Sequence, residues 1–181
     1  MQKTTTITRT ITRATYTVVF LVIAVLLPQF CHIVGGVQIS SQISPMHLPV
    51  YLCAIFAGPL GAMAVGLLAP ILSSLIFGMP IFPAPMLPMC LELMTYGMVF
   101  GMIYSRIAGS GTHLAKVVCA LLGAMVAGRI VLLLANLMLV DGYSVSNLVS
   151  NAIVNQVTGM IIQLLLVPLV AFLVDKFTNR D

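Results

Sequence analysis

Long apolar runs separated by short polar segments make up most of this chain. A helix needs about 20 apolar residues to cross the hydrocarbon core of a bilayer. Four runs approach or exceed that length, at residues 14 to 34, 89 to 105, 114 to 140 and 148 to 174. A fifth apolar stretch, residues 48 to 77, contains Gly58-Pro59, a pair that disfavours helix continuation. This stretch is therefore either one broken span or two short ones.

The basic residues decide between these two interpretations. They form three clusters beside apolar runs: Lys3, Arg9 and Arg13 before the first run, Arg106, His113 and Lys116 after the 89 to 105 run, and Lys176 and Arg180 after the last. The positive-inside rule places all three clusters in the cytoplasm, so an even number of spans must separate the first two. Two short spans, at residues 48 to 57 and 62 to 77, satisfy that condition.

We therefore predict an all-α fold, an integral membrane bundle of six transmembrane helices with a short second helix and both termini in the cytoplasm. Residues 1 to 13 are expected to form a cytoplasmic N-terminal segment of a single transmembrane domain that covers residues 1 to 181. The opposite loops, at residues 35 to 47, 78 to 88 and 141 to 147, carry no Lys or Arg, as external loops should.

The composition agrees with a membrane location. Hydrophobic residues make up 60% of the chain and charged residues 7%, with a mean hydropathy of +1.14, which leaves too little polar surface for a soluble domain. We expect a multi-pass protein of the cell membrane, in contact with membrane lipid. The net charge of +4 comes from short segments beside the spans rather than from a nucleic-acid-binding patch. The four cysteines show no C-x-x-C spacing, and we predict neither a metal nor a cofactor.

Polar residues within the predicted spans gather in the outer half of the bilayer. Three spans supply candidates for substrate binding: Glu92 and Tyr96, Arg129 and Asn136, and Asn147, Asn151 and Asn155. Within each span these residues are four or seven positions apart, and that spacing puts them on one helix face. A charge at mid-bilayer costs about 2.5 to 3.5 kcal/mol, so Glu92 and Arg129 should face the bundle interior and find partners there.

Two interpretations of these polar residues remain open. In the first, Glu92 and Arg129 form a buried ion pair and the Asn residues hydrogen-bond between helices, which would make the chain a non-transport membrane scaffold. In the second, they line a pocket that opens to the outside and holds a ligand with polar groups of its own. The two interpretations are compatible when no ligand is bound.

The predicted external loops add candidates for such a pocket. Residues 78 to 89 hold four prolines, three methionines and no charge, a composition that suits a lid, and its candidate contacts are Met79 and Phe82. Gln38 and His47 are the candidates from the first external loop. His47 precedes the second span, where it is either a hydrogen-bonding residue at the helix end or a ligand contact.

Enzyme chemistry has little support in the sequence. Glu92 is the only carboxylate within the predicted spans, and the chain contains no H-E-x-x-H, G-x-S-x-G or Walker motif. We therefore predict that the chain is not an enzyme and does not itself hydrolyse ATP. A small lipid-processing enzyme with Glu92 as its base is the remaining alternative.

Three segments resemble the substrate-binding subunit, or S-component, of energy-coupling factor (ECF) transporters. They are HLPV at residues 47 to 50, AGPLGAMAVGLLAPILSSLIFGMP at residues 57 to 80, and P-A-P-M followed by ELMTYG at residues 92 to 97. The length, the six spans, the cytoplasmic termini and the short second helix are also similar to that family. The resemblance implies capture of a vitamin or related micronutrient from outside by helices four to six and the first and third external loops.

The resemblance also implies partners. An S-component docks on a transmembrane coupling subunit driven by two cytoplasmic ATPase subunits, and it topples in the membrane to release its cargo. Family members dock through an A-x-x-x-A pattern on the first helix. The nearest match here is Thr10, Ala14 and Val18, with Val18 in place of the second alanine. Pyridoxine, pantothenate and a queuosine precursor are the candidate substrates.

Overall fold

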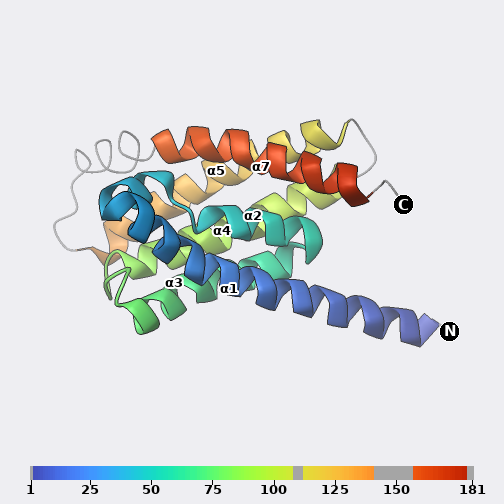
Figure 1. The fold of residues 1–181 in the computed structure, drawn as a ribbon, viewed down its shortest axis with the longest axis horizontal. Helices are drawn as coiled ribbons and strands as arrows, with labels where there is room; N and C mark the ends of the chain where they lie inside the picture. Colours follow the sequence, from blue (N-terminus) through green and yellow to red (C-terminus); the bar gives the residue numbers. More distant parts are fainter. Residues whose placement is uncertain (1, 108–111, 141–156, 179–181) are drawn as a thin grey trace.

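The chain folds as a bundle of helices (Figure 1). The computed structural model describes residues 2–107, 112–140 and 157–178. Within these ranges the helices are α1 (Gln2–Ile43), α2 (His47–Phe56), α3 (Pro59–Phe77), α4 (Met86–Arg106), α5 (His113–Leu139) and α7 (Val157–Thr178). Helix α1 begins and α7 ends at the same end of the bundle, as expected for termini on one side of the membrane (Figure 1).

The break between α2 and α3 occurs where the sequence predicts it. Gly58 has a φ of 86°, a left-handed conformation that favours glycine, and Pro59 is the first residue of α3. Because proline lacks an N–H and fixes φ, it suits a helix start and prevents α2 from continuing. The prediction that this stretch forms two helices is confirmed, and α2, at 10 residues, is the short second helix.

The first helix is longer than predicted. Residues 35 to 47 were expected to form an external loop, but α1 continues through a kink at Gly36, with φ 74° and ψ 167°, to Ile43. The Ser40 hydroxyl donates to the Pro28 carbonyl at 3.4 Å. In a straight helix residues 12 positions apart are about 18 Å apart, so this bond exists only because the chain turns at Gly36. Gly36 therefore marks a bend between two helical pieces.

Helices α3 and α4 pack closely because glycines remove side chains at their crossing. A Cβ added to Gly66 would overlap the backbone of Leu93 and Met94, and one added to Gly97 would lie 2.6 Å from backbone atoms of Ala62. Such close contacts between backbones are typical of small residues in membrane bundles. They place the buried face of α4 directly against α2 and α3, and this face carries the polar residues of the candidate site.

The outer surface of the bundle is apolar. Ile33, Leu75 and Met138 are among many large hydrophobic residues that are well exposed. Four helical segments of the described residues are long and apolar enough to span a membrane: Ile7–Gly36, Pro59–Phe77, Met86–Arg106 and His113–Leu139. Helix α2 and the part of α7 at Val157–Leu173 are shorter apolar helices. The all-α membrane bundle predicted from the sequence is confirmed.

Candidate functional site

Glu92 lies at the centre of a buried polar cluster. It is on α4, six residues after Met86, and is only 3% exposed. Tyr96, one turn further along α4, donates its hydroxyl to Glu92 Oε1 at 2.8 Å. Because the two residues are four positions apart, they share a helix face, and both are buried against neighbouring helices.

Arg129 brings a positive charge to the same carboxylate from α5. Its guanidinium nitrogen NH1 lies 3.2 Å from Glu92 Oε1. Gly128, just before Arg129, leaves the space that the Tyr96 ring occupies, because a Cβ at Gly128 would overlap ring atoms Cδ1 and Cε1 of Tyr96. Glycine at position 128 therefore lets the Tyr96 ring pack closely against α5, beside Arg129.

His47 approaches the other oxygen of the carboxylate from the start of α2. Its Nδ1 lies 3.1 Å from the Ser44 carbonyl, and its Nε2 lies 3.9 Å from Glu92 Oε2. A carbonyl oxygen only accepts hydrogen bonds, so this contact assigns the hydrogen to Nδ1. In the neutral ring Nε2 then directs a lone pair toward a carboxylate oxygen. A hydrogen-bond donor placed between them would satisfy both acceptors.

Tyr51 completes the cluster and was not among the residues predicted from the sequence. It is fully buried, and its ring centroid lies 5.6 Å from that of Tyr96 and 5.3 Å from that of Phe100. Among the residues that the structure describes, its hydroxyl has no hydrogen-bond partner. The available signal was its spacing: Tyr51 is four residues after His47, as Tyr96 is after Glu92.

The cluster combines acceptors, donors and flat rings that are largely buried. Glu92 Oε2 and His47 Nε2 accept hydrogen bonds, while Arg129 and the Tyr51 hydroxyl donate them. The rings of His47 and Tyr96 lie 5.2 Å apart at an interplanar angle of 57°. Buried polar groups are costly unless they are paired, so this arrangement suits a solute that carries both donors and acceptors.

Of the other predicted site residues, the structure describes three and leaves four side chains undescribed. Asn136, half-buried on α5, donates to the Leu132 carbonyl at 2.9 Å within its own helix. Met79 and Phe82 are exposed in the segment between α3 and α4, where the Met79 carbonyl accepts a hydrogen bond from Ser73 at 2.7 Å. The Gln38 side chain and residues Asn147, Asn151 and Asn155 lie outside what the structure describes.

Comparison with known families decides what kind of bundle this is. The family of the ECF transporter, substrate-specific component, matches residues 12–173 of the 181-residue chain. The chain belongs to this family. Searches of curated proteins and of solved structures gave no match.

As an S-component, the protein is a subunit of a transporter in the plasma membrane rather than a classical enzyme. Membership implies a small-molecule substrate and partnership with the transmembrane and ATPase modules of an ECF transporter. The three residues predicted to dock on the coupling subunit, Thr10, Ala14 and Val18, share an exposed face of α1. Their position on the outside of the bundle leaves them accessible to a partner helix.

Proposed function

We propose that this S-component captures a small vitamin-like solute from outside in the cluster around Glu92, and supplies it to an ATP-driven importer. The observation that carries the proposal is that side chains from three helices, Tyr96, Arg129 and His47, converge on one buried carboxylate. Glu92 is six residues, or about 9 Å, into a helix that enters from the outer surface in the predicted topology. A solute from outside would reach it before the apolar half of the bundle.

The geometry indicates the chemistry of the solute. A nitrogen with two hydrogens, such as an amino group, can lie about 2.9 Å from both Glu92 Oε2 and His47 Nε2, which are 3.9 Å apart. Arg129 would pair with a carboxylate or carbonyl of the same solute. Tyr51 and Tyr96 offer rings on which a flat heterocycle can lie. A compact heterocyclic or zwitterionic solute meets all three conditions.

The remaining predicted residues complete the proposed site. Asn136 and the stripe of Asn147, Asn151 and Asn155 would extend it with amide groups, and Gln38 would contribute from the outer end of α1. Met79 and Phe82, in the proline-rich segment after α3, would cover the solute once it is bound. A lid of this kind excludes water and strengthens the buried polar contacts.

Ligand binding by the purified protein tests the proposal. Native mass spectrometry against vitamins and nucleobases, including pyridoxine, pantothenate and a queuosine precursor, should identify at least one bound solute. Matched compounds with and without an amino group would test the contact with Glu92 and His47. Binding of none of these solutes, with uptake unaffected by substitutions at Glu92, would contradict the assignment of this cluster as the substrate site.

Tyr51→Phe isolates one contact of the proposed site. The substitution removes only the hydroxyl, and the described residues give that hydroxyl no partner, so the thermal stability of the protein without solute should not fall. If the hydroxyl binds the solute, affinity should fall about 3- to 10-fold, as expected for one lost hydrogen bond. The matched control is Tyr16→Phe, on the exposed part of α1, which should change neither quantity.

Docking on the coupling subunit is expected to depend on the Thr10, Ala14 and Val18 face. Ala14→Leu would add bulk at the centre of this face, and we expect loss of co-purification with the coupling subunit and of uptake. Solute binding by the isolated S-component should be unchanged, because Ala14 is exposed at the other end of the bundle. The same substitution at exposed Ala115 of α5 is the control and should leave docking intact.

A non-transport scaffold is the alternative function, and one observation favours it. Arg129 already pairs with the Glu92 carboxylate, so the cluster is charge-balanced without a solute. In that case Glu92 and Arg129 would serve only to hold α4 against α5. The two functions differ in the outcome for a paired substitution of these residues, which is set out in the Discussion.

A further inference from the structure

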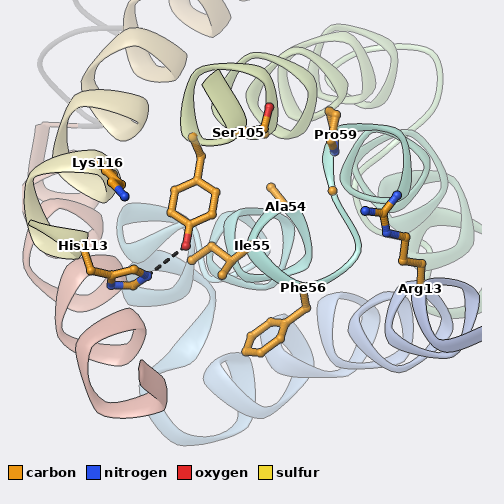
Figure 2. A pocket seen from close by; sticks show the side chains of 11 residues that line it. Arg13, Ala54, Ile55, Phe56, Pro59, Ser105, His113 and Lys116 are labelled. Atoms are coloured by element: carbon orange, nitrogen blue, oxygen red, sulfur yellow. Dashed lines mark hydrogen bonds between the residues drawn. The ribbon is translucent and has the colours of Figure 1, made fainter. Parts of the chain in front are cut away.

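A hollow lies at the end of the bundle away from Glu92, which is the cytoplasmic end in the predicted topology, and Figure 2 shows side chains that line it. Its volume is about 240 Å³, and it lies where the start of α3, the end of α4 and the start of α5 face α1 and α2. Eleven residues line it: Arg13, Ala54, Ile55, Phe56, Gly58, Pro59, Gly101, Tyr104, Ser105, His113 and Lys116. Ser105 is 13 residues, or about 20 Å, along α4 from Glu92, so the hollow is separate from the proposed substrate site.

The lining of this cytoplasmic hollow has only one sign of charge. Arg13 extends from α1 toward Pro59, while His113 and Lys116 lie across the hollow on α5 (Figure 2). None of the described residues that line it is acidic. Basic side chains around a low-dielectric recess concentrate a positive potential there, and such a recess attracts anions.

Two helix starts add to this positive potential. Helix α3 begins at Pro59 and α5 begins at His113, and both residues line the hollow. The N–H groups in the first turn of a helix carry partial positive charge. Pro59 itself has no N–H, and the Ala115 N–H already donates to Thr112 Oγ1, so the other N–H groups of these two turns supply this charge. The two helix starts, together with Arg13 and Lys116, form an environment suited to a phosphate group, because a phosphate group accepts several hydrogen bonds at once.

Apart from Ser105, the rest of the lining is apolar or aromatic. Ala54, Ile55 and Phe56, at the end of α2, form one wall of the hollow. Tyr104 also lines the hollow, and its hydroxyl is 2.9 Å from His113 Nε2. An apolar wall beside basic groups, at the ends of membrane-spanning helices, matches a phosphate that is attached to an apolar body. It matches a freely soluble anion less well.

We propose that this cytoplasmic hollow binds a phosphate group, with the head group of an anionic phospholipid of the inner leaflet as its source. Free phosphate has the same chemistry and is the other possible source. The site would anchor the cytoplasmic end of the S-component to its surrounding lipid through α1 and α5. It does not depend on the identity of the solute bound near Glu92.

The test compares full-length protein in neutral detergent with three probes: phosphatidylglycerol, phosphatidylcholine and inorganic phosphate. The wild type should be stabilised against heat by phosphatidylglycerol but not by phosphatidylcholine. In Arg13→Gln/Lys116→Gln the half-saturating concentration of phosphatidylglycerol should rise about tenfold or more, since each basic residue near an anionic lipid contributes appreciably to attraction. If only inorganic phosphate stabilises the wild type, and this effect is lost in the same variant, the hollow is a phosphate site whose ligand is free phosphate rather than a lipid head group.

The control is Arg9→Gln/Arg106→Gln, which removes the same charge from the same end of the protein but alters no lining residue. It should respond to phosphatidylglycerol as the wild type does. The proposal is overturned if the two variants respond equally. It is also overturned if Arg13→Gln/Lys116→Gln loses only co-purification with the coupling subunit, because the hollow would then receive an acidic group of the partner. Should the double variant misfold, Arg13→Gln and Lys116→Gln are measured singly, with retained lipid counted by native mass spectrometry.

Discussion

Arg129→Met is expected to destabilise the folded protein by about 3 kcal/mol and to weaken solute binding about 100-fold. The substitution leaves the Glu92 carboxylate buried without its guanidinium partner, and removing one member of a buried ion pair costs about 3–5 kcal/mol. We expect the lower end of that range because the Arg129 side chain is 16% exposed. The loss of affinity reflects the cost of removing one charged contact to a buried ligand. Titration with SDS in mixed micelles measures stability, and native mass spectrometry measures binding.

The double variant Glu92→Gln/Arg129→Met separates structure from function. It removes both charges, so no unpaired charge remains buried, and stability should return to within about 1 kcal/mol of the wild type. Solute binding should stay weak, because neither charged contact is restored. A double variant that is as stable as the wild type and transports equally well would instead support the scaffold function.

Gly66→Ala is expected to cost about 2–3 kcal/mol of stability. The added Cβ would overlap backbone atoms of Leu93, and backbone cannot move aside as a flexible side chain can. Helices α3 and α4 would have to separate, and this would shift Glu92, which directly precedes Leu93 on α4. We therefore expect reduced solute affinity as well as a lower midpoint in the SDS titration.

Gly123→Ala is the matched control for Gly66→Ala. It also adds one methyl group to a helical glycine, but the nearest atom is Cδ1 at the end of the flexible Ile103 side chain. Since alanine favours the helix over glycine by about 1 kcal/mol, the variant should be close to the wild type in stability. Equal losses in both variants would show that backbone contact between α3 and α4 is not what makes Gly66 necessary.

Much of the candidate site could be predicted because burying a charge in a membrane is costly. Glu92 and Arg129 stood out as charged residues within apolar runs, and the four-residue spacing placed Tyr96 beside Glu92. The structure brings these three residues into contact at 2.8 and 3.2 Å. Tyr51 was missed because a tyrosine within an apolar helix carries no such cost and gives no comparable signal. Its four-residue spacing from His47 was a weak signal, and its position beside Tyr96 in the structure identifies it.

His47 shows where the sequence left two roles open. The sequence placed it at a helix start, and a hydrogen bond to the Ser44 carbonyl agrees with that role. Nε2 of the same ring lies 3.9 Å from Glu92 Oε2, and this position supports the second role, which we propose. One side chain can serve both roles, because its two ring nitrogens point away from each other.

The sequence by itself determined the membrane location, the number of spans and the break at Gly58-Pro59. These features follow from local quantities: the length of apolar runs, the distribution of charge along the chain and the geometry of proline and glycine. The tertiary structure decided which oxygen of Glu92 each partner contacts, that α1 bends at Gly36, and that a basic hollow forms at the cytoplasmic end. Those features depend on distances between residues far apart in the chain, and helix packing alone sets these distances.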